Sequence, residues 1–150
     1  CRLGTKQMLE TLTDISEGRG KPNDIDFLLE LSDTIKSGSL CGLGQTAPNP
    51  VITTLRYFMS EYEAHIYEKR CPALVCKNLI EYNINEEKCV GCQTCLKNCP
   101  VNAITGQPGK IHSIDPEKCI KCGMCLEVCP KTISAVEKID SKKPSQEAVH

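Results

Sequence analysis

Apolar residues recur every three or four positions in three segments of the first 66 residues, at 3–17, 23–37 and 49–66. This spacing places them on one face of an α-helix. Asn49 before Pro50 is a typical helix start, because Asn caps the first turn and proline fits the first helical position. Three amphipathic helices joined by short links predict a small helical bundle over residues 1–66.

The ends of these helices are also marked in the sequence. Gly18-Arg19-Gly20 follows the first segment, and Ser37-Gly38 ends the second. Leu40–Gly44 is rich in glycine, so we expect a flexible loop there.

The pattern changes after a junction at residues 67–80. Short β-branched segments typical of strands now flank cysteine-rich loops, and they are Ile80–Ile84, Ile111–Ile114 and Ile133–Val136. We expect a ferredoxin-like, duplicated β-α-β domain over residues 81–136 and a solvated tail over 137–150. The predicted fold class is therefore α+β, a helical bundle followed by this domain.

Composition narrows the functions that the chain can have. The 150 residues carry a net charge of −1, which gives no electrostatic argument for nucleic-acid binding. No signal peptide or membrane-spanning run is recognisable, and we expect a cytoplasmic protein. Twelve cysteines then point to metal ligation in a reducing compartment rather than to disulfides. With no Trp and two Phe the core is thin, so bound metal is expected to contribute to folding.

Eight of the cysteines form one run that occurs twice, thirty residues apart. Each run has the spacing Cys-x2-Cys-x2-Cys-x3-Cys-Pro, at Cys89, Cys92, Cys95, Cys99 and Pro100, and at Cys119, Cys122, Cys125, Cys129 and Pro130. This is the spacing of bacterial-type ferredoxins that hold two [4Fe–4S] clusters. The chemistry that it predicts is one-electron transfer.

In such runs the fourth cysteine ligates the other cluster. One cluster is therefore assigned to Cys89, Cys92, Cys95 and Cys129, and the other to Cys119, Cys122, Cys125 and Cys99. We expect each fourth cysteine to begin a helix, and the crossing to hold the clusters within tunnelling reach. The alternative for these eight positions is zinc, since repeated Cys-x2-Cys pairs also build zinc sites; iron content separates the two.

The helical half resembles a known family. Cys1-Arg2-x-Gly4, Ser39-Leu40-Cys41-x-Leu43-Gly44 and Phe58-x-x-Glu61-Tyr62-x-x-His65 are similar to the C-terminal part of the NADH-binding flavoprotein subunit of respiratory complex I and its soluble relatives. In that family the bundle binds one [4Fe–4S] cluster through three closely spaced cysteines and a fourth about forty residues on. The resemblance implies that Cys1 and Cys41 are two of these ligands. The sequence starts at Cys1 rather than Met, and we expect the other two ligands upstream.

A two-cluster domain after the bundle narrows the resemblance to the flavoprotein subunit of NAD(P)-linked multimeric [FeFe] hydrogenases, including electron-bifurcating ones. This implies FMN and NAD(P) sites upstream. It also implies a hydrogenase catalytic subunit, a thioredoxin-like [2Fe–2S] subunit and soluble ferredoxin as partners. NAD-dependent formate dehydrogenases and complex I-like enzymes are alternatives. A freestanding ferredoxin carrier and a structural zinc module are alternatives of other classes. The chain by itself is expected to catalyse no reaction.

Two cysteines, Cys71 and Cys76, remain in the junction. They are either ordinary linker cysteines or, together with His65, three ligands of a tetrahedral Zn²⁺ site. The fourth ligand proposed from the sequence is His112. Such a site would hold the joint locally and act as a hinge for the ferredoxin domain.

Overall fold

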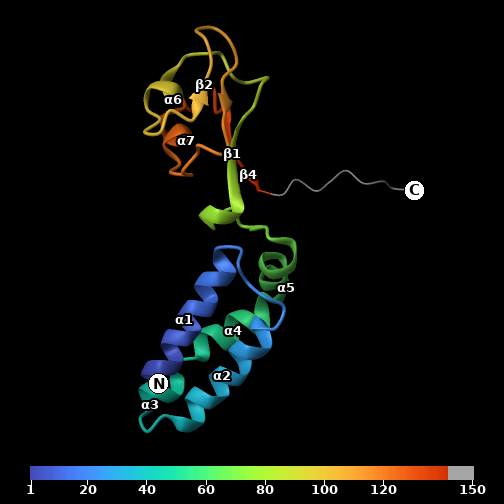
Figure 1. Cartoon of the computed structure of the whole chain (residues 1–150), viewed down its shortest axis with the longest axis vertical. Coiled ribbons are helices and arrows are strands. Elements are labelled where there is room, and N and C mark those ends of the chain that lie inside the picture. Colours follow the sequence, from blue (N-terminus) through green and yellow to red (C-terminus); the bar gives the residue numbers. More distant parts are fainter. Residues whose placement is uncertain (142–150) are drawn as a thin grey trace, which may run out of the picture. The chain divides into compact units, whose positions relative to one another are not determined.

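The computed structural model describes residues 1–141, which form two compact units, residues 1–79 and residues 80–141. The first unit is helical, and the second combines small sheets with short helices (Figure 1). The mixture of helices and strands agrees with the class expected from the sequence. Within residues 1–141, no helix has both the length and the apolar character that crossing a membrane requires.

The helical unit contains more, and shorter, helices than the apolar pattern predicts. They are α1 (Arg2–Ser16), α2 (Asp24–Gly38), α3 (Gly42–Thr46), α4 (Asn49–Tyr57), α5 (Met59–Glu63), the π-helix η1 (Ala64–Glu68) and the 3₁₀ helix η2 (Lys77–Leu79). The expectation of a loop through Gly44 was wrong, because α3 begins at Gly42. The third predicted helix is interrupted at Phe58, whose backbone leaves the helical region at φ −127° and ψ 34°.

Apolar side chains of α1, α2, α4 and η1 form one core, with Met8, Ile15, Leu28, Leu31, Ile35, Leu55 and Ile66 buried in it. Figure 1 shows α1 and α2 running side by side. They approach closely at Gly4, where an added Cβ would lie 2.5 Å from Cγ1 of Ile35. Glycine at this position therefore sets the spacing of the two longest helices.

The second unit is built on two antiparallel strand pairs. β1 (Ile80–Ile84) pairs with β4 (Val136–Asp140), and β2 (Ile104–Thr105) pairs with β3 (Ser113–Ile114). β4 corrects the sequence prediction, because residues 137–140 are a strand and not part of a tail. The remainder of the predicted tail, 142–150, lies outside the described residues. Strand β2 was not predicted, since two residues give too short a pattern.

Two short helices of the second unit, α6 (Thr94–Lys97) and α7 (Met124–Val128), each contain the third cysteine of a run. Cys99 and Cys129 therefore follow the helices rather than begin them, which corrects the sequence prediction. Cys129 has extended backbone, at φ −67° and ψ 125°, and ends α7. The core of this unit combines cysteines with apolar residues of β1, β2 and β4.

Candidate metal centres

The two cysteine loops repeat an unusual backbone conformation as well as a sequence spacing. The second residue after the first cysteine has positive φ in both loops, at Gly91 (70°) and Lys121 (55°). The residue before each helix does too, at Gln93 (63°) and Gly123 (82°). Left-handed residues are unfavourable unless the surroundings require them. Their recurrence with different side chains shows that the curvature of the loop, and not the residue type, is what the repeat preserves.

Each loop encloses one cavity that is lined by four cysteines. The first cavity is lined by Cys89, Cys92 and Cys95 together with Cys129 of the other run. The second is lined by Cys119, Cys122 and Cys125 together with Cys99. The structure thus brings the eight predicted ligands together in two sets of four. Each set contains the first three cysteines of one run and the fourth cysteine of the other.

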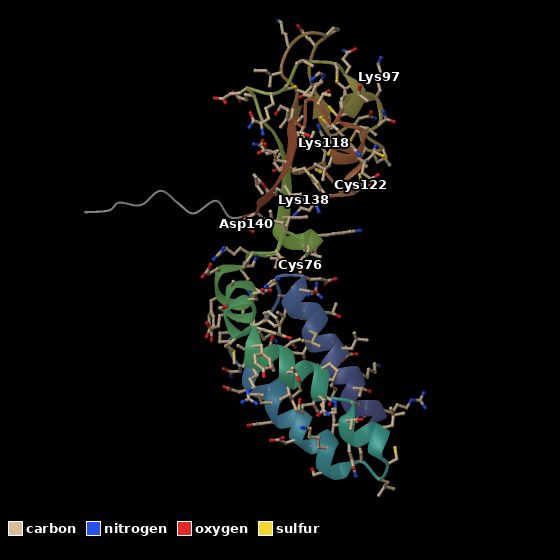
Figure 2. The ribbon with its side chains drawn as sticks, turned by 180° about the vertical axis from the view of Figure 1, so that it is seen from behind. Cys76, Lys97, Lys118, Cys122, Lys138 and Asp140 are labelled. Atoms are coloured by element: carbon tan, nitrogen blue, oxygen red, sulfur yellow. The ribbon has the colours of Figure 1, made fainter. Side chains whose placement is uncertain are left out.

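The thiols of a set line the same cavity in largely apolar surroundings. In both loops the second cysteine is exposed and the third is buried; Cys122 is labelled in Figure 2. Burial and the nearby Cys119 and Cys122 raise the pKa of the Cys125 thiol to about 11. Burial also raises the pKa of Cys95, and Cys92 and Cys89 add to the effect.

Burial and the neighbouring thiols therefore both disfavour the thiolate forms of Cys95 and Cys125. Four thiolates in one apolar cavity repel one another, and a bound cationic core removes this penalty. Thiolate sulfur is the donor that iron–sulfur clusters require, with four ligands for each cubane. The number, chemical type and grouping of the donors therefore fit one [4Fe–4S] cluster in each cavity.

The polar groups beside the sulfurs differ between the cavities. In the first, the hydroxyl and N–H of Thr94 lower the pKa of Cys92, and Nδ1 of His112 lies 3.8 Å from Sγ of Cys89. In the second, the backbone N–H of Ala103 donates to Sγ of Cys99 at 3.3 Å. Hydrogen bonds to ligand sulfur tune the potential of a cluster.

His112, the fourth zinc ligand predicted from the sequence, lies in the second unit. Its ring is 2% exposed, lines the first cavity within the second unit, and faces a cysteine of that cavity. The assignment of His112 as the fourth zinc ligand stays a prediction, because the group of three donors in the first unit does not include it. The sequence signal was ambiguous, since a histidine before a strand has no distinctive spacing.

The other three predicted zinc ligands do lie together in the first unit. His65, Cys71 and Cys76 each offer one ligand atom, and these atoms lie within 4.8 Å of one another. His65 comes from the π-helix η1, and the cysteines from the turn segment that follows it. Nitrogen and sulfur donors at this separation suit tetrahedral Zn²⁺, with one position left for a further ligand.

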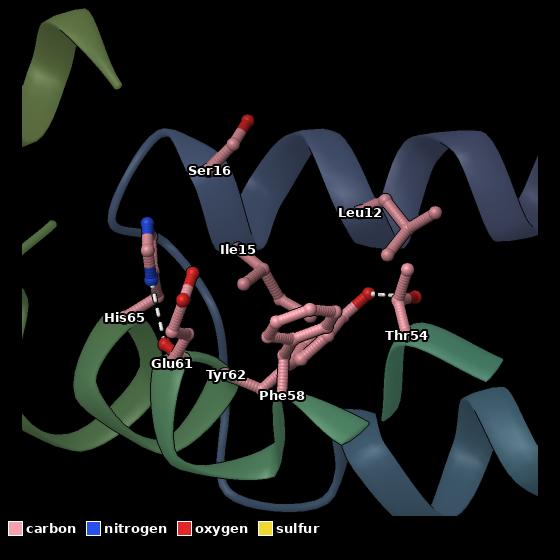
Figure 3. Close-up of a pocket in the computed structure, with 8 residues that line it drawn as sticks. All are labelled: Leu12, Ile15, Ser16, Thr54, Phe58, Glu61, Tyr62 and His65. Atoms are coloured by element: carbon pink, nitrogen blue, oxygen red, sulfur yellow. Dashed lines mark hydrogen bonds between the residues drawn. The ribbon is translucent and has the colours of Figure 1, made fainter. Parts of the chain in front are cut away.

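Hydrogen bonding fixes the tautomer and the orientation of the His65 ring. Its Nδ1 lies 2.6 Å from the carbonyl oxygen of Glu61, one turn earlier, as Figure 3 shows. A carbonyl only accepts, so the proton of the neutral ring is at Nδ1 and Nε2 carries the free lone pair. Nε2 lies 3.4 Å from Sγ of Cys76. Metal-bound histidines commonly have this second hydrogen bond, which fixes tautomer and ring orientation.

The same figure shows the cavity at whose edge His65 lies. It is lined by Leu12, Ile15 and Ser16 of α1, by Thr54 of α4, by Phe58 between the helices, and by Glu61 and Tyr62 of α5. The Tyr62 hydroxyl lies 2.9 Å from Oγ1 of Thr54. This contact crosses the interruption at Phe58 and links α4 to α5. The cavity thus reflects the interrupted helix, and its lining contains no second group of metal ligands.

The two cysteines of the trio differ in acidity. Burial raises the pKa of the Cys71 thiol, but the N–H groups of Cys76 and Val75, with the Cys76 thiol, outweigh burial and lower it to about 7. Sγ of Cys71 accepts those N–H groups at 3.5 and 3.4 Å. Burial and the neighbouring Cys71 raise the pKa of Cys76 to about 11. The metal-free trio therefore carries one thiolate near neutral pH, on Cys71.

The last two predicted ligands, Cys1 and Cys41, are exposed and precede α1 and α3. An added Cβ at Gly44 would lie 3.1 Å from Cβ of Cys1 and 2.7 Å from Oγ of Ser39. Cys1 thus adjoins the helix that Cys41 caps. Oγ of Ser39 is buried here and has no hydrogen-bond partner among residues 1–141. Two thiols and an unpaired hydroxyl group at this end of the bundle are compatible with part of a cluster site.

Comparison with known protein families gives one match in each half of the chain. Residues 1–65 match the model of the NADH-ubiquinone oxidoreductase-F iron–sulfur binding region, and residues 82–137 match that of the 4Fe–4S dicluster domain. The NADP-reducing hydrogenase subunit HndC of Solidesulfovibrio fructosivorans is 48% identical over 112 residues, which cover 75% of this chain and 23% of that protein.

Two further relatives come from other enzymes. The F-type subunit of the NADH-quinone oxidoreductase of Streptomyces coelicolor is 42% identical over 72 residues, which cover 48% of this chain and 16% of the relative. The NADP(+)-dependent formate dehydrogenase subunit beta of Moorella thermoacetica is 38% identical over 58 residues, which cover 39% and 8%. The chain thus spans less than a quarter of each relative. It contains the iron–sulfur binding region found in F-type subunits of NADH-quinone oxidoreductases, followed by a 4Fe–4S dicluster domain.

Proposed function

We propose that this chain is the electron-relay region of a multisubunit NAD(P)-linked oxidoreductase. The observation that carries the proposal is the pair of cavities, each lined by three cysteines of one run and one of the other. A bound [4Fe–4S] cluster supplies a reversible one-electron couple at each cavity. The thiolates hold it, and the apolar walls limit water around the sulfurs, which keeps the potential set by the protein.

Iron analysis of the anaerobically reconstituted protein tests this function. We expect eight iron atoms bound to the cysteines of residues 80–141 and visible absorption typical of iron–sulfur clusters. Cys95→Ser, which removes a buried ligand of the first cavity, should lower the iron content by about four atoms, since one cubane needs four thiolates. Zinc in place of iron at these positions would refute the relay and favour a structural zinc module.

The helical unit is proposed to hold part of a further [4Fe–4S] cluster. Cys1 and Cys41 supply two of the four thiolates that such a cluster needs. The iron–sulfur match over residues 1–65 and the proximity of Cys1 to α3 support this assignment. In the longer protein, replacing Cys41 by Ser should remove one cluster and leave the two of the dicluster domain.

For the parent enzyme we favour an FMN-containing hydrogenase that couples hydrogen oxidation to NAD(P) and ferredoxin. We propose that it acts by electron bifurcation. The support is the likeness to HndC, which extends over 75% of this chain. The alternatives are a formate dehydrogenase or a complex I-like enzyme, whose subunits are similar over shorter segments. Purification of the intact complex separates them: a hydrogenase catalytic subunit and a thioredoxin-like [2Fe–2S] subunit should co-purify. A chain that purifies alone would instead be a ferredoxin carrier.

We also propose that His65, Cys71 and Cys76 bind one Zn²⁺ immediately before the second unit begins at Ile80. Support comes from the grouping of the three ligand atoms and from the fixed tautomer of His65. Cys71→Ser should lose zinc and keep all iron, whereas Cys95→Ser should lose iron and keep zinc. Absence of zinc from the unmodified protein purified without chelators would refute the site.

A further inference from the structure

The two cavities are related by the thirty-residue repeat, but one pair of equivalent positions differs in chemistry. Tyr82 lies seven residues before Cys89, and His112 lies seven residues before Cys119. Each lines the cavity formed by the loop of the other repeat: His112 the first cavity, and Tyr82 the second. The repeat therefore places one aromatic ring beside each set of sulfurs, and only the first cavity receives an imidazole.

The imidazole is oriented toward a ligand sulfur. Nδ1 of His112 lies 3.8 Å from Sγ of Cys89, within the range of a hydrogen bond to sulfur. Nε2 is buried and has no partner among the described residues. A neutral imidazole carries one proton, and the acceptor that this ring faces within residues 1–141 is the sulfur at Nδ1. The tautomer that satisfies the geometry is therefore the one that donates Nδ1–H to Cys89.

The position of the ring is constrained from the opposite side. An added Cβ at Gly106 would lie 2.5 Å from Cδ2 and 2.7 Å from Cγ of His112. Any residue larger than glycine would push the ring away from its place. With 2% of its surface exposed, the ring is also shielded from water that could replace the sulfur as acceptor.

We infer that His112 is a positioning residue that raises the reduction potential of the cluster in the first cavity by donating a hydrogen bond to Cys89. Reduction adds one electron, and the extra negative charge is spread over the ligand sulfurs. A donor to sulfur stabilises that charge, so the reduced form is favoured. No proton moves and no bond breaks in this step. The inference rests on the proposed function, and it makes the two clusters unequal, with the added electron favoured on the one beside His112.

Two variants of matched shape isolate the donor. Asn and Leu branch alike, but the side-chain nitrogen of Asn can take the place of Nδ1, whereas Leu has no donor. In His112→Leu we expect the ratio of reduced to oxidised first-cavity cluster to fall about tenfold at a fixed solution potential, equivalent to about 59 mV for one electron. In His112→Asn the ratio should stay close to that of the unmodified protein.

Redox titration of the anaerobically purified protein, followed by electron paramagnetic resonance, measures this ratio. Cys89→Ser marks the signal of the first cavity, because it changes one ligand there. Tyr82→Phe is the control for the second cavity and should leave the first-cavity potential unchanged. Gly106→Ala should lower that potential in the same direction as His112→Leu, and the double variant should fall no further, because both remove the same contact.

The outcomes separate this inference from the function on which it rests. Fewer than eight irons in the unmodified protein would refute the relay itself. With eight irons present, an unchanged potential in His112→Leu, or equal falls in the Leu and Asn variants, would overturn the role of His112 alone. Loss of the cluster from both variants would make the ring purely structural and would equally overturn it. If only the His112→Leu variant fails to assemble its cluster, the first-cavity potential of Gly106→Ala decides the role of His112, since this variant displaces the ring without removing it.

Discussion

Nε2 of His65 lies 3.4 Å from Sγ of Cys76, and the opposite nitrogen of the same ring is held by a backbone carbonyl. The ring therefore presents its free lone pair to the space that it shares with Cys76 and Cys71. The three donors come from a π-helix and from the turns after it. π-Helices are rare and are often found at functional sites, which agrees with the proposed zinc site.

Proton release should accompany zinc binding at this trio. Metal binding requires both thiols to be deprotonated. Because the metal-free Cys71 has a pKa of about 7 and Cys76 of about 11, only Cys76 still holds its proton between these values. Zinc affinity should therefore rise about tenfold per pH unit in this window, and more steeply below it, where Cys71 is also protonated.

Calorimetry in two buffers of different ionisation heat measures the released protons. The protein should keep its iron while zinc is removed with a selective chelator. Cys76→Ser is the control, because it removes the group that titrates and should abolish the pH dependence in the upper range. A zinc affinity that is independent of pH there would contradict the assignment of Cys76 as a ligand.

Exchange of the fourth cysteine between the cavities gives a second prediction. Cys99→Ser should change the spectrum of the cluster held by Cys119, Cys122 and Cys125, because Cys99 lines that cavity. The variants Cys99→Ser and Cys119→Ser should therefore affect the same paramagnetic signal. A match between Cys99→Ser and Cys89→Ser would instead show that each run binds its own cluster.

The close approach of α1 and α2 gives a third prediction. Gly4→Ala should destabilise the helical unit by about 1–3 kcal/mol, because its Cβ would overlap the side chain of Ile35. Gly38→Ala is the matched control at the end of α2, where nothing lies within 4 Å of an added Cβ. It should be neutral, or stabilising by up to about 1 kcal/mol, since alanine favours helix.

Thermal unfolding followed by circular dichroism compares these two variants. The melting temperature should fall for Gly4→Ala and stay the same or rise for Gly38→Ala. Equal losses in the two variants would mean that Ile35 can rotate away and that the helices do not need glycine at their contact.

The core of the helical unit gives a fourth prediction. Leu28 is fully buried, so Leu28→Ala should cost about 2–5 kcal/mol through lost burial and the cavity that remains. Leu9, on the outer side of α1, is 65% exposed, and Leu9→Ala should change the stability by less than about 0.5 kcal/mol. Chemical denaturation of both variants measures the difference. A large loss in Leu9→Ala would show that this face is covered in the protein as purified.

The spacing of the cysteines along the chain was enough to predict how they group. A cubane needs four thiolates at short separations, and one tight loop supplies three of them in a fixed register. Cys89 and Cys119 could therefore be assigned together with their followers, and the structure brings each set into one cavity. The grouping of Cys71 and Cys76 with His65 was also predicted, because the three lie close to one another along the chain.

Other features had no local signal. The interruption at Phe58 falls inside an apolar pattern that predicts one continuous helix. After the interruption, Ile66 is buried in the core and Tyr62 packs against it. Residues 137–140 are polar enough to read as a tail, yet they form β4 because β1 offers them a complete set of backbone partners. Pairing of distant strands depends on chain closure, which short windows do not encode.

His112 shows most clearly which features the sequence determines and which depend on the tertiary structure. The order of cysteines along the chain is enough to specify donor atoms, their number and the chemistry that they support, because most of the ligand geometry is satisfied within a single loop. The neighbour of a particular sulfur depends instead on how the repeat folds back on itself, and a ring seven residues before one loop comes to lie beside the sulfur of the other. Long-range packing alone makes that contact, so only the tertiary structure shows it.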